Sequence, residues 1–195
     1  MADSDVIGDV STALERLLTS AMSTLTPPPA PIAQVHDLSG VIPTAPALLT
    51  LFLYEIAQDP SVRNRPPIRE VDATGYQIRK PPMGVLLRYL VTAWGGDRIT
   101  EQRMLGRVLQ VLYDHAVLSG ADLTGGVAGT RDSIKVTLAS LTLEEKSRVW
   151  YAIQKPYRVS LNYEVRVANI DAEITEDAPP VSARVLDQAV PEPVP

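Results

Sequence analysis

The sequence predicts an α+β fold in which helices pack on one mainly antiparallel or mixed sheet of about four strands. Two long apolar runs, residues 47–56 and 85–94, are typical of strands buried on both faces. Residues 159–167 alternate between apolar and polar side chains, which indicates a strand with one polar face. Before and between these runs, apolar residues recur at helical spacing, and they predict the helices that cover the sheet.

The first expected element is an amphipathic helix over residues 4–22, with Ser4 placed to cap its first turn. Residues 26–31 contain four prolines, so they predict an extended strap between this helix and the rest of the domain. The apolar residues of the helix fall on one stripe at helical spacing, and they are Val6, Val10, Leu14, Leu17 and Leu18.

The middle of the chain alternates strands with proline-containing loops. Residues 32–38 predict a short edge strand before the first apolar run. Residues 59–67 form a polar loop punctuated by prolines, and residues 68–80 predict a hairpin arm that turns at 73–75. The second apolar run follows two prolines and ends at a Gly-Gly-Asp turn, residues 95–97.

The second half predicts two helices and two strands. Thr100 is expected to cap a helix whose apolar spacing continues to about Leu118. Residues 119–130, with four glycines, predict a mobile loop, and residues 133–139 alternate as a strand. Thr142 and Glu145 form a capping box for a helix that ends before Pro156.

The last strand is expected to end near residue 170, which divides the chain into two parts. Residues 1–170 are predicted to form a single domain. Residues 171–195 are acidic and rich in proline, so we expect a tail without a core of its own.

Composition disfavours several classes of protein. The chain has 195 residues, a net charge of -5 and no cysteine, which argues against a nucleic-acid binder and excludes disulfides and thiolate sites. Its longest apolar runs fall well short of the ~20 residues of a membrane span, so we expect no direct membrane insertion. The acidic N-terminus does not resemble a signal peptide, which favours assembly in the cytoplasm.

No constellation of residues predicts catalysis. The two histidines, His36 and His115, are far apart in sequence and lack the partners of a metal site. The Gly-rich segment 120–129 lacks the Gly-Lys-Ser/Thr ending of a phosphate-binding loop. Glu144 lies at a helix start, where acidic residues are common without any catalysis. We therefore expect no enzymatic activity, no metal and no cofactor.

Several segments together resemble a known family. They are Val6–Val10, Leu51–Tyr54, Pro60–Asn64, Arg79–Pro82, Leu87–Leu90, Thr92–Trp94, Leu105–Leu112, Glu145–Trp150 and Tyr157–Tyr163. In order and spacing the chain resembles the cap, or tail-terminator, proteins of phage-tail-like contractile injection systems. The similarity is to the N-terminal domain family found in virulence-cassette and antifeeding-prophage particles.

The resemblance implies a structural protein that forms a hexameric ring and terminates the inner tube and sheath at the distal end of the particle. Sheath and inner tube proteins are its implied partners, and it would be assembled in the bacterial cytoplasm. A baseplate or tube-end adaptor of the same particle is the first alternative, and a small carboxylate-dependent enzyme is the second.

The polar face of the last strand is either solvated or paired with a neighbouring subunit, and the sequence leaves both interpretations open. Val181, Val185 and Leu186 are spaced to make apolar contacts if the tail docks on a neighbour. The full set of expected interface residues is Arg63, Asn64, Arg79, Lys80, Arg158, Asn162, Arg166, Val181, Val185 and Leu186.

Overall fold

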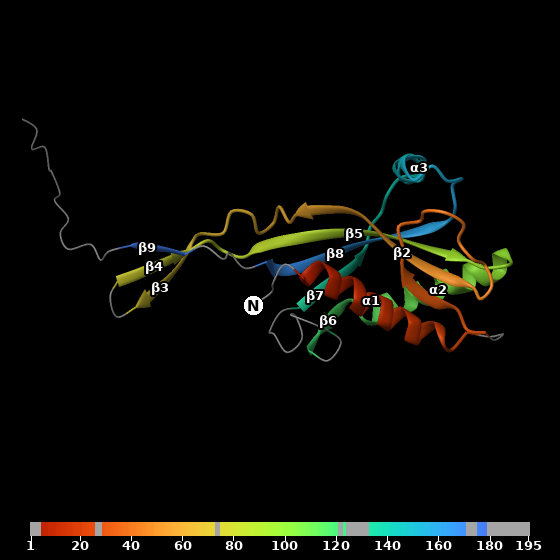
Figure 1. Ribbon diagram of the computed structural model, residues 1–195, viewed down its shortest axis with the longest axis horizontal. Helices are drawn as coiled ribbons and strands as arrows, with labels where there is room; N and C mark the ends of the chain where they lie inside the picture. Colours follow the sequence, from red (N-terminus) through yellow and green to blue (C-terminus); the bar gives the residue numbers. More distant parts are fainter. Residues whose placement is uncertain are drawn as a thin grey trace, which may run out of the picture. The chain divides into compact units, whose positions relative to one another are not determined.

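The computed structural model describes residues 5–25, 29–72, 75–120, 123, 133–170 and 175–178. The chain divides into two compact units. The first contains Met1–Asn64 and Pro82–Asp171, and the second contains Arg65–Pro81 and Ala172–Pro195. Figure 1 shows the helices and strands of both.

The first unit is built on a six-stranded sheet in the order β1-β2-β5-β8-β7-β6. Neighbouring strands are antiparallel except β1 and β2, which are parallel. The predicted α+β class is therefore correct, but the predicted count of about four strands is wrong. The strands are β1 (Ile32–Val35), β2 (Leu48–Gln58), β5 (Met83–Trp94), β6 (Val117–Ser119), β7 (Ser133–Leu138) and β8 (Ser160–Ile170).

The count was low because both edge strands are short. The short edge strand predicted over residues 32–38 is confirmed as β1, which has four residues but was left out of the count of about four. β6 has only three residues, too few to show a periodicity of its own. Leu118 also continues the apolar spacing of the preceding helix, so the helix was expected to extend over β6. That helix instead ends at Asp114.

Three helices cover the sheet among the described residues: α1 (Val6–Met22), α2 (Arg98–Asp114) and α3 (Leu143–Ala152). α1 and α2 pack on one face, and α3 lies on the opposite face (Figure 1). Alternate residues of β5 serve the two faces. Tyr89 and Val91 enter the core with α1 and α2, whereas Leu90 and Trp94 enter the core with α3.

The smaller core beneath α3 contains both tryptophans. Trp94 is 8% exposed and Trp150 is 1% exposed, so both are buried between the sheet and α3. Their rings meet edge to face with centroids 6.4 Å apart. This geometry is favoured by the quadrupoles of the two rings.

The ends of α2 and α3 follow from local hydrogen bonds. The predicted capping box at the start of α3 is confirmed, since the Thr142 hydroxyl accepts the Glu145 N–H and the Glu145 carboxylate accepts the Thr142 N–H. At the start of α2 the N-cap is Asp97 rather than the predicted Thr100. The Asp97 carboxylate accepts the N–H of Thr100 at 2.9 Å.

The second unit contains a three-stranded antiparallel sheet in the order β3-β4-β9. β3 (Ile68–Asp72) and β4 (Gly75–Arg79) confirm the predicted hairpin arm. β9 (Thr175–Ala178) comes from the segment that was expected to be a tail. Ser4, most of the Gly-rich segment, residues 26–28 of the strap and residues 179–195 lie outside the described residues.

Candidate functional site

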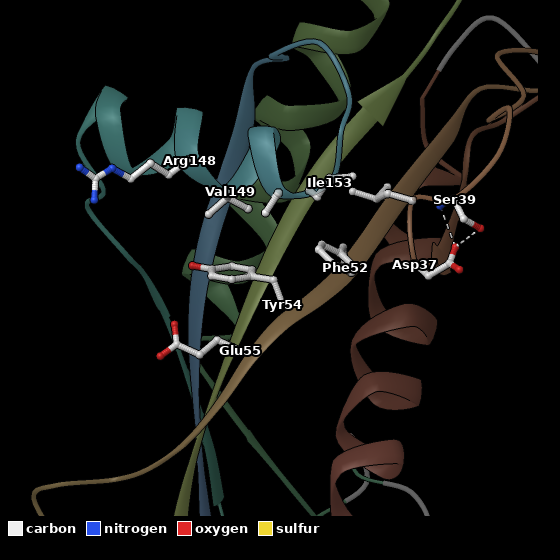
Figure 2. Close-up of a pocket in the computed structure, with 10 residues that line it drawn as sticks. Asp37, Ser39, Phe52, Tyr54, Glu55, Arg148, Val149 and Ile153 are labelled. Carbon is white, nitrogen blue, oxygen red and sulfur yellow. Dashed lines mark hydrogen bonds between the residues drawn. The ribbon is translucent and has the colours of Figure 1, made fainter.

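A groove of about 600 Å³ lies beside α3 on the outer face of the six-stranded sheet. Figure 2 shows Phe52 and Tyr54 of β2 below the groove, with Val149 of α3 and Ile153, the C-cap of α3, on the other side. Residues 37–39 line one end. Burial raises the pKa of Tyr54 above its ordinary value, so this phenol stays neutral at physiological pH.

The charged groups along this groove are already held by neighbours. The Asp37 carboxylate accepts the N–H and the hydroxyl of Ser39 at 2.9 and 2.8 Å, and these bonds lower its pKa. Glu55 accepts a hydrogen bond from Arg88 at 2.7 Å. The groove therefore combines an apolar wall with ionised groups at its rim, an arrangement that suits a side chain or segment of a protein partner.

A row of alternating charges crosses three strands on the same face. Arg88 of β5 is paired with Glu55 of β2 and lies 3.7 Å from Glu164 of β8. Arg166 in turn is 3.1 Å from Glu164. The hydrogen bond from Arg88 to Glu55 raises the pKa of the guanidinium, which stays charged. The half-exposed Arg166 ends this row.

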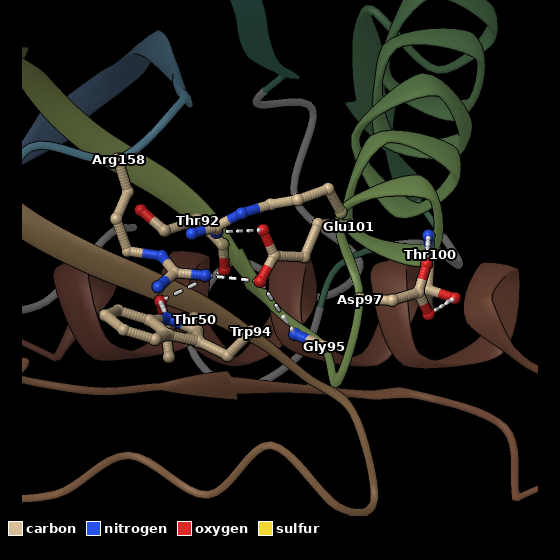
Figure 3. A network of polar contacts seen from close by, with 9 residues as sticks. Thr50, Thr92, Trp94, Gly95, Asp97, Thr100, Glu101 and Arg158 are labelled. Atoms are coloured by element: carbon tan, nitrogen blue, oxygen red, sulfur yellow. Dashed lines mark hydrogen bonds and ion pairs between the residues drawn. The ribbon is translucent and has the colours of Figure 1, made fainter.

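Arg158 belongs to a second polar network, shown in Figure 3. Its guanidinium donates to Glu101 and lies 4.4 Å from the centre of the Trp94 ring, a cation–π arrangement. Glu101 also accepts the N–H of Gly95, and the Trp94 indole N–H donates to the Thr50 hydroxyl at 2.9 Å. The network ties the start of α2 to the approach to β8.

Asn162 is buried, with 2% of its surface exposed. It pairs across the sheet with Leu90, which belongs to the core under α3. Within the described residues neither the amide nitrogen nor the amide oxygen of the Asn162 side chain has a hydrogen-bond partner. In this conformation Asn162 presents almost no surface to a neighbouring subunit, and its predicted interface role stays a prediction.

The other expected interface residues lie in separate places. Arg63 and Asn64 are exposed in the loop after β2. Arg79, at the end of β4, and the exposed Lys80 belong to the second unit. Arg158, Asn162 and Arg166 lie along β8 and its approach, but Arg158 belongs to the network with Glu101 and Arg166 to the row with Glu164. Val181, Val185 and Leu186 lie outside the described residues.

Exposed apolar side chains on α2 and α3 were missed by sequence reasoning. On α2, Ile99 and Tyr113 are 56% and 85% exposed, and their spacing of 14 residues returns to nearly the same face of the helix. On α3, Leu143 and Tyr151 are 68% and 86% exposed. The sequence did offer a signal for them, because these apolar residues lie outside the apolar stripe with which each helix faces the core.

Two observations bear on classes of site that the sequence disfavoured. Among the described residues, no group of three or more histidine, aspartate or glutamate side chains is placed to hold a metal ion. Within the same residues, no helix combines the length and apolar character needed to cross a membrane.

The chain is similar to proteins of one family and to several solved structures. The family described as the Pvc16 N-terminal domain matches residues 9–184. A sheath/tube terminator of the extracellular contractile injection system PVC, in the extended state, matches with a TM-score of 0.58 and 21% identity over 97% of this chain. The tube-terminating cap of the anti-feeding prophage gives the same TM-score and identity over 95%.

This chain covers 66% and 61% of the lengths of those two proteins. Both likenesses establish the fold. No significant match was found among curated protein sequences.

Proposed function

The chain belongs to the Pvc16 N-terminal domain family, and on this basis we propose that it is a structural cap that terminates the tube and sheath of a contractile injection particle. The observation that carries the proposal is the fold it shares, over nearly its whole length, with a sheath/tube terminator and a tube-terminating cap. Its partners are then the inner tube and sheath proteins at the distal end. The protein acts by binding and not by catalysis.

The cap is proposed to be a ring of six copies, assembled in the bacterial cytoplasm and then carried on the particle. A closed ring needs head-to-tail contacts between two different surfaces of each subunit. The exposed side chains of α2 and α3 offer such surfaces, since Tyr113 and Tyr151 are exposed tyrosines and tyrosine is enriched at interfaces. The groove beside α3 is a concave surface on the face of the sheet opposite α2, where a neighbouring subunit could bind.

Loss of this chain is expected to abolish control of tube and sheath length. Particles assembled without it should have a broad length distribution in electron micrographs, and supplying the intact chain should restore a single length. An averaged reconstruction of the capped end should show six-fold symmetry with this chain in the terminal layer. Another symmetry would contradict the hexamer, and a position at the baseplate would show an adaptor instead of a cap.

The C-terminal segment is proposed to attach the cap domain, residues 1–170, to a neighbouring subunit or to the last sheath layer. A cut after Ala178 keeps β9 and removes Val181, Val185 and Leu186. We expect the melting temperature of the isolated protein to stay within about 2 °C, because a proline-rich acidic segment has little core to lose. Capping of particles should weaken in a pull-down with assembled sheath. Full capping by the shortened chain would contradict the proposal.

A further inference from the structure

The strand β1 has two edges, and only one of them faces the sheet. The N–H groups of Ile32 and His36 donate to carbonyls beside and within β2 at 3.3 and 3.0 Å. Because successive N–H groups of a strand point in opposite directions, those of Ala33 and Val35 point away from β2, toward the outer edge. An edge of this kind is ordinarily open to pairing with another chain.

Side chains of α1 occupy this outer edge. The Thr19 hydroxyl accepts the N–H of Ala33 at 3.1 Å and donates to the carbonyl of the same residue at 3.2 Å. The Glu15 carboxylate accepts the N–H of Val35 at 2.8 Å. The Thr19 hydroxyl thus makes both of the bonds that a residue of an added strand would make with Ala33.

The spacing of the two side chains explains how a helix can do this. Residues four apart on a helix are about 6 Å apart along its axis, at 1.5 Å per residue. Two residues of a strand span about 6.6 Å. The spacing between Glu15 and Thr19 along α1 therefore matches the spacing between the outward N–H groups of Val35 and Ala33 along β1. Pro31, two residues before Ala33 and just ahead of β1, is buried and has no N–H to offer.

We infer that α1 closes the β1 edge of the sheet to strand addition by a second copy of this chain, with Thr19 and Glu15 as the closing residues. An added strand gains its affinity from main-chain hydrogen bonds, so it would first have to displace both side chains. Only the biological meaning rests on the proposed function: a terminating subunit with a closed edge does not template further strands there. The closure itself is a property of the purified protein.

The double variant Thr19→Val/Glu15→Ala tests the inference. Valine keeps the shape of threonine without its hydroxyl, and alanine removes the carboxylate. The amide hydrogens of Ala33 and Val35 should exchange about tenfold faster, the factor expected for one lost hydrogen bond. The chain has no cysteine, so Gln34→Cys on the exposed strand gives a single thiol that reports contact between β1 edges. Under mild oxidation this thiol should form a cross-linked dimer only in the double variant.

Two controls separate edge closure from a general loosening of α1. Thr12→Val makes the same substitution on the same helix, where the hydroxyl donates to the Gly8 carbonyl, and it should change neither readout. Thr19→Ser keeps the hydroxyl and should behave as wild type. If the double variant does not fold, Thr19→Val alone carries the test at Ala33. Two results in a folded variant would overturn the inference: unchanged amide exchange, or faster exchange without cross-linking through the introduced thiol. Either result would do so whether or not the chain caps particles.

Discussion

Replacing Trp150 by alanine is expected to destabilise the protein by about 3–5 kcal/mol, the usual range for removing a buried tryptophan. Trp150 is the buried residue of α3, and its indole N–H donates to the Ser160 hydroxyl at 3.3 Å. Its ring also meets Trp94 and Tyr157 edge to face, at 6.4 and 6.5 Å. Without it α3 keeps only half-buried apolar contacts such as Val149 with this core. The loss is a large share of the roughly 5–15 kcal/mol that ordinarily stabilises a domain.

Denaturant unfolding followed by circular dichroism measures this loss. The matched control is Tyr151→Ala, which removes the adjacent aromatic side chain on the same helix. Tyr151 is 86% exposed, so this change should stay within about 0.5 kcal/mol of wild type. If Trp150→Ala unfolds like wild type but fails to cap particles, Trp150 is an interface anchor and its assignment to the core is wrong.

The elements that the sequence predicts well are those whose pattern is local and long. β5 reads as one apolar run because both of its faces are covered, with Tyr89 packed under α1 and α2 and Leu90 packed under α3. The capping box of Thr142 and Glu145 depends on residues three apart, so it could be read directly. The short edge strand β1 was still predicted, within residues 32–38. β6 has three residues, too few to carry such a pattern, and its existence depends on the strand beside it.

The candidate site was harder to predict because it is assembled from distant parts of the chain. Glu55, Arg88 and Glu164 meet only through the registers of three strands. A bulge in β2 between Leu53 and Glu55 contributes to this register, and no feature of the apolar run indicates it. The sequence shows the charged residues inside the apolar runs, but it does not show which residues they pair with.

The alternating pattern of the last strand shows the same limit. It correctly separates the core residues, such as Val165, from the polar face. It does not say what covers that face. Ser160 and Asn162 are buried on the side of α3, whereas Arg166 on the same face is half exposed. A period of two residues gives the face of a side chain, and only the tertiary structure decides how much of that face is covered.

The free energy of unfolding is expected to fall by about 2 kcal/mol between pH 9 and pH 12 through Tyr89 alone, at about 1.36 kcal/mol per pKa unit. Burial raises the pKa of Tyr89 from 10.0 to about 12, although a hydrogen bond with Ser11 acts in the opposite direction. The unfolded chain therefore loses this proton first. The contribution is fully present below the unfolded pKa of 10.0 and is lost as the pH rises through the folded pKa of about 12. Burial also raises the pKa of Tyr163 to about 12, which acts in the same direction.

Urea titrations at about pH 9 and pH 12 measure the effect, and Tyr89→Phe isolates it. Phenylalanine keeps the ring in the core but has no proton to lose, so the fall in stability over this range should shrink by about 2 kcal/mol. Ser11 keeps its hydrogen bond to the Ile7 carbonyl at 3.0 Å in this variant. Tyr113→Phe is the matched control, because it removes the hydroxyl of a tyrosine that is 85% exposed and lies outside the core. An unchanged loss of stability in Tyr89→Phe would show that alkaline unfolding begins elsewhere in the core.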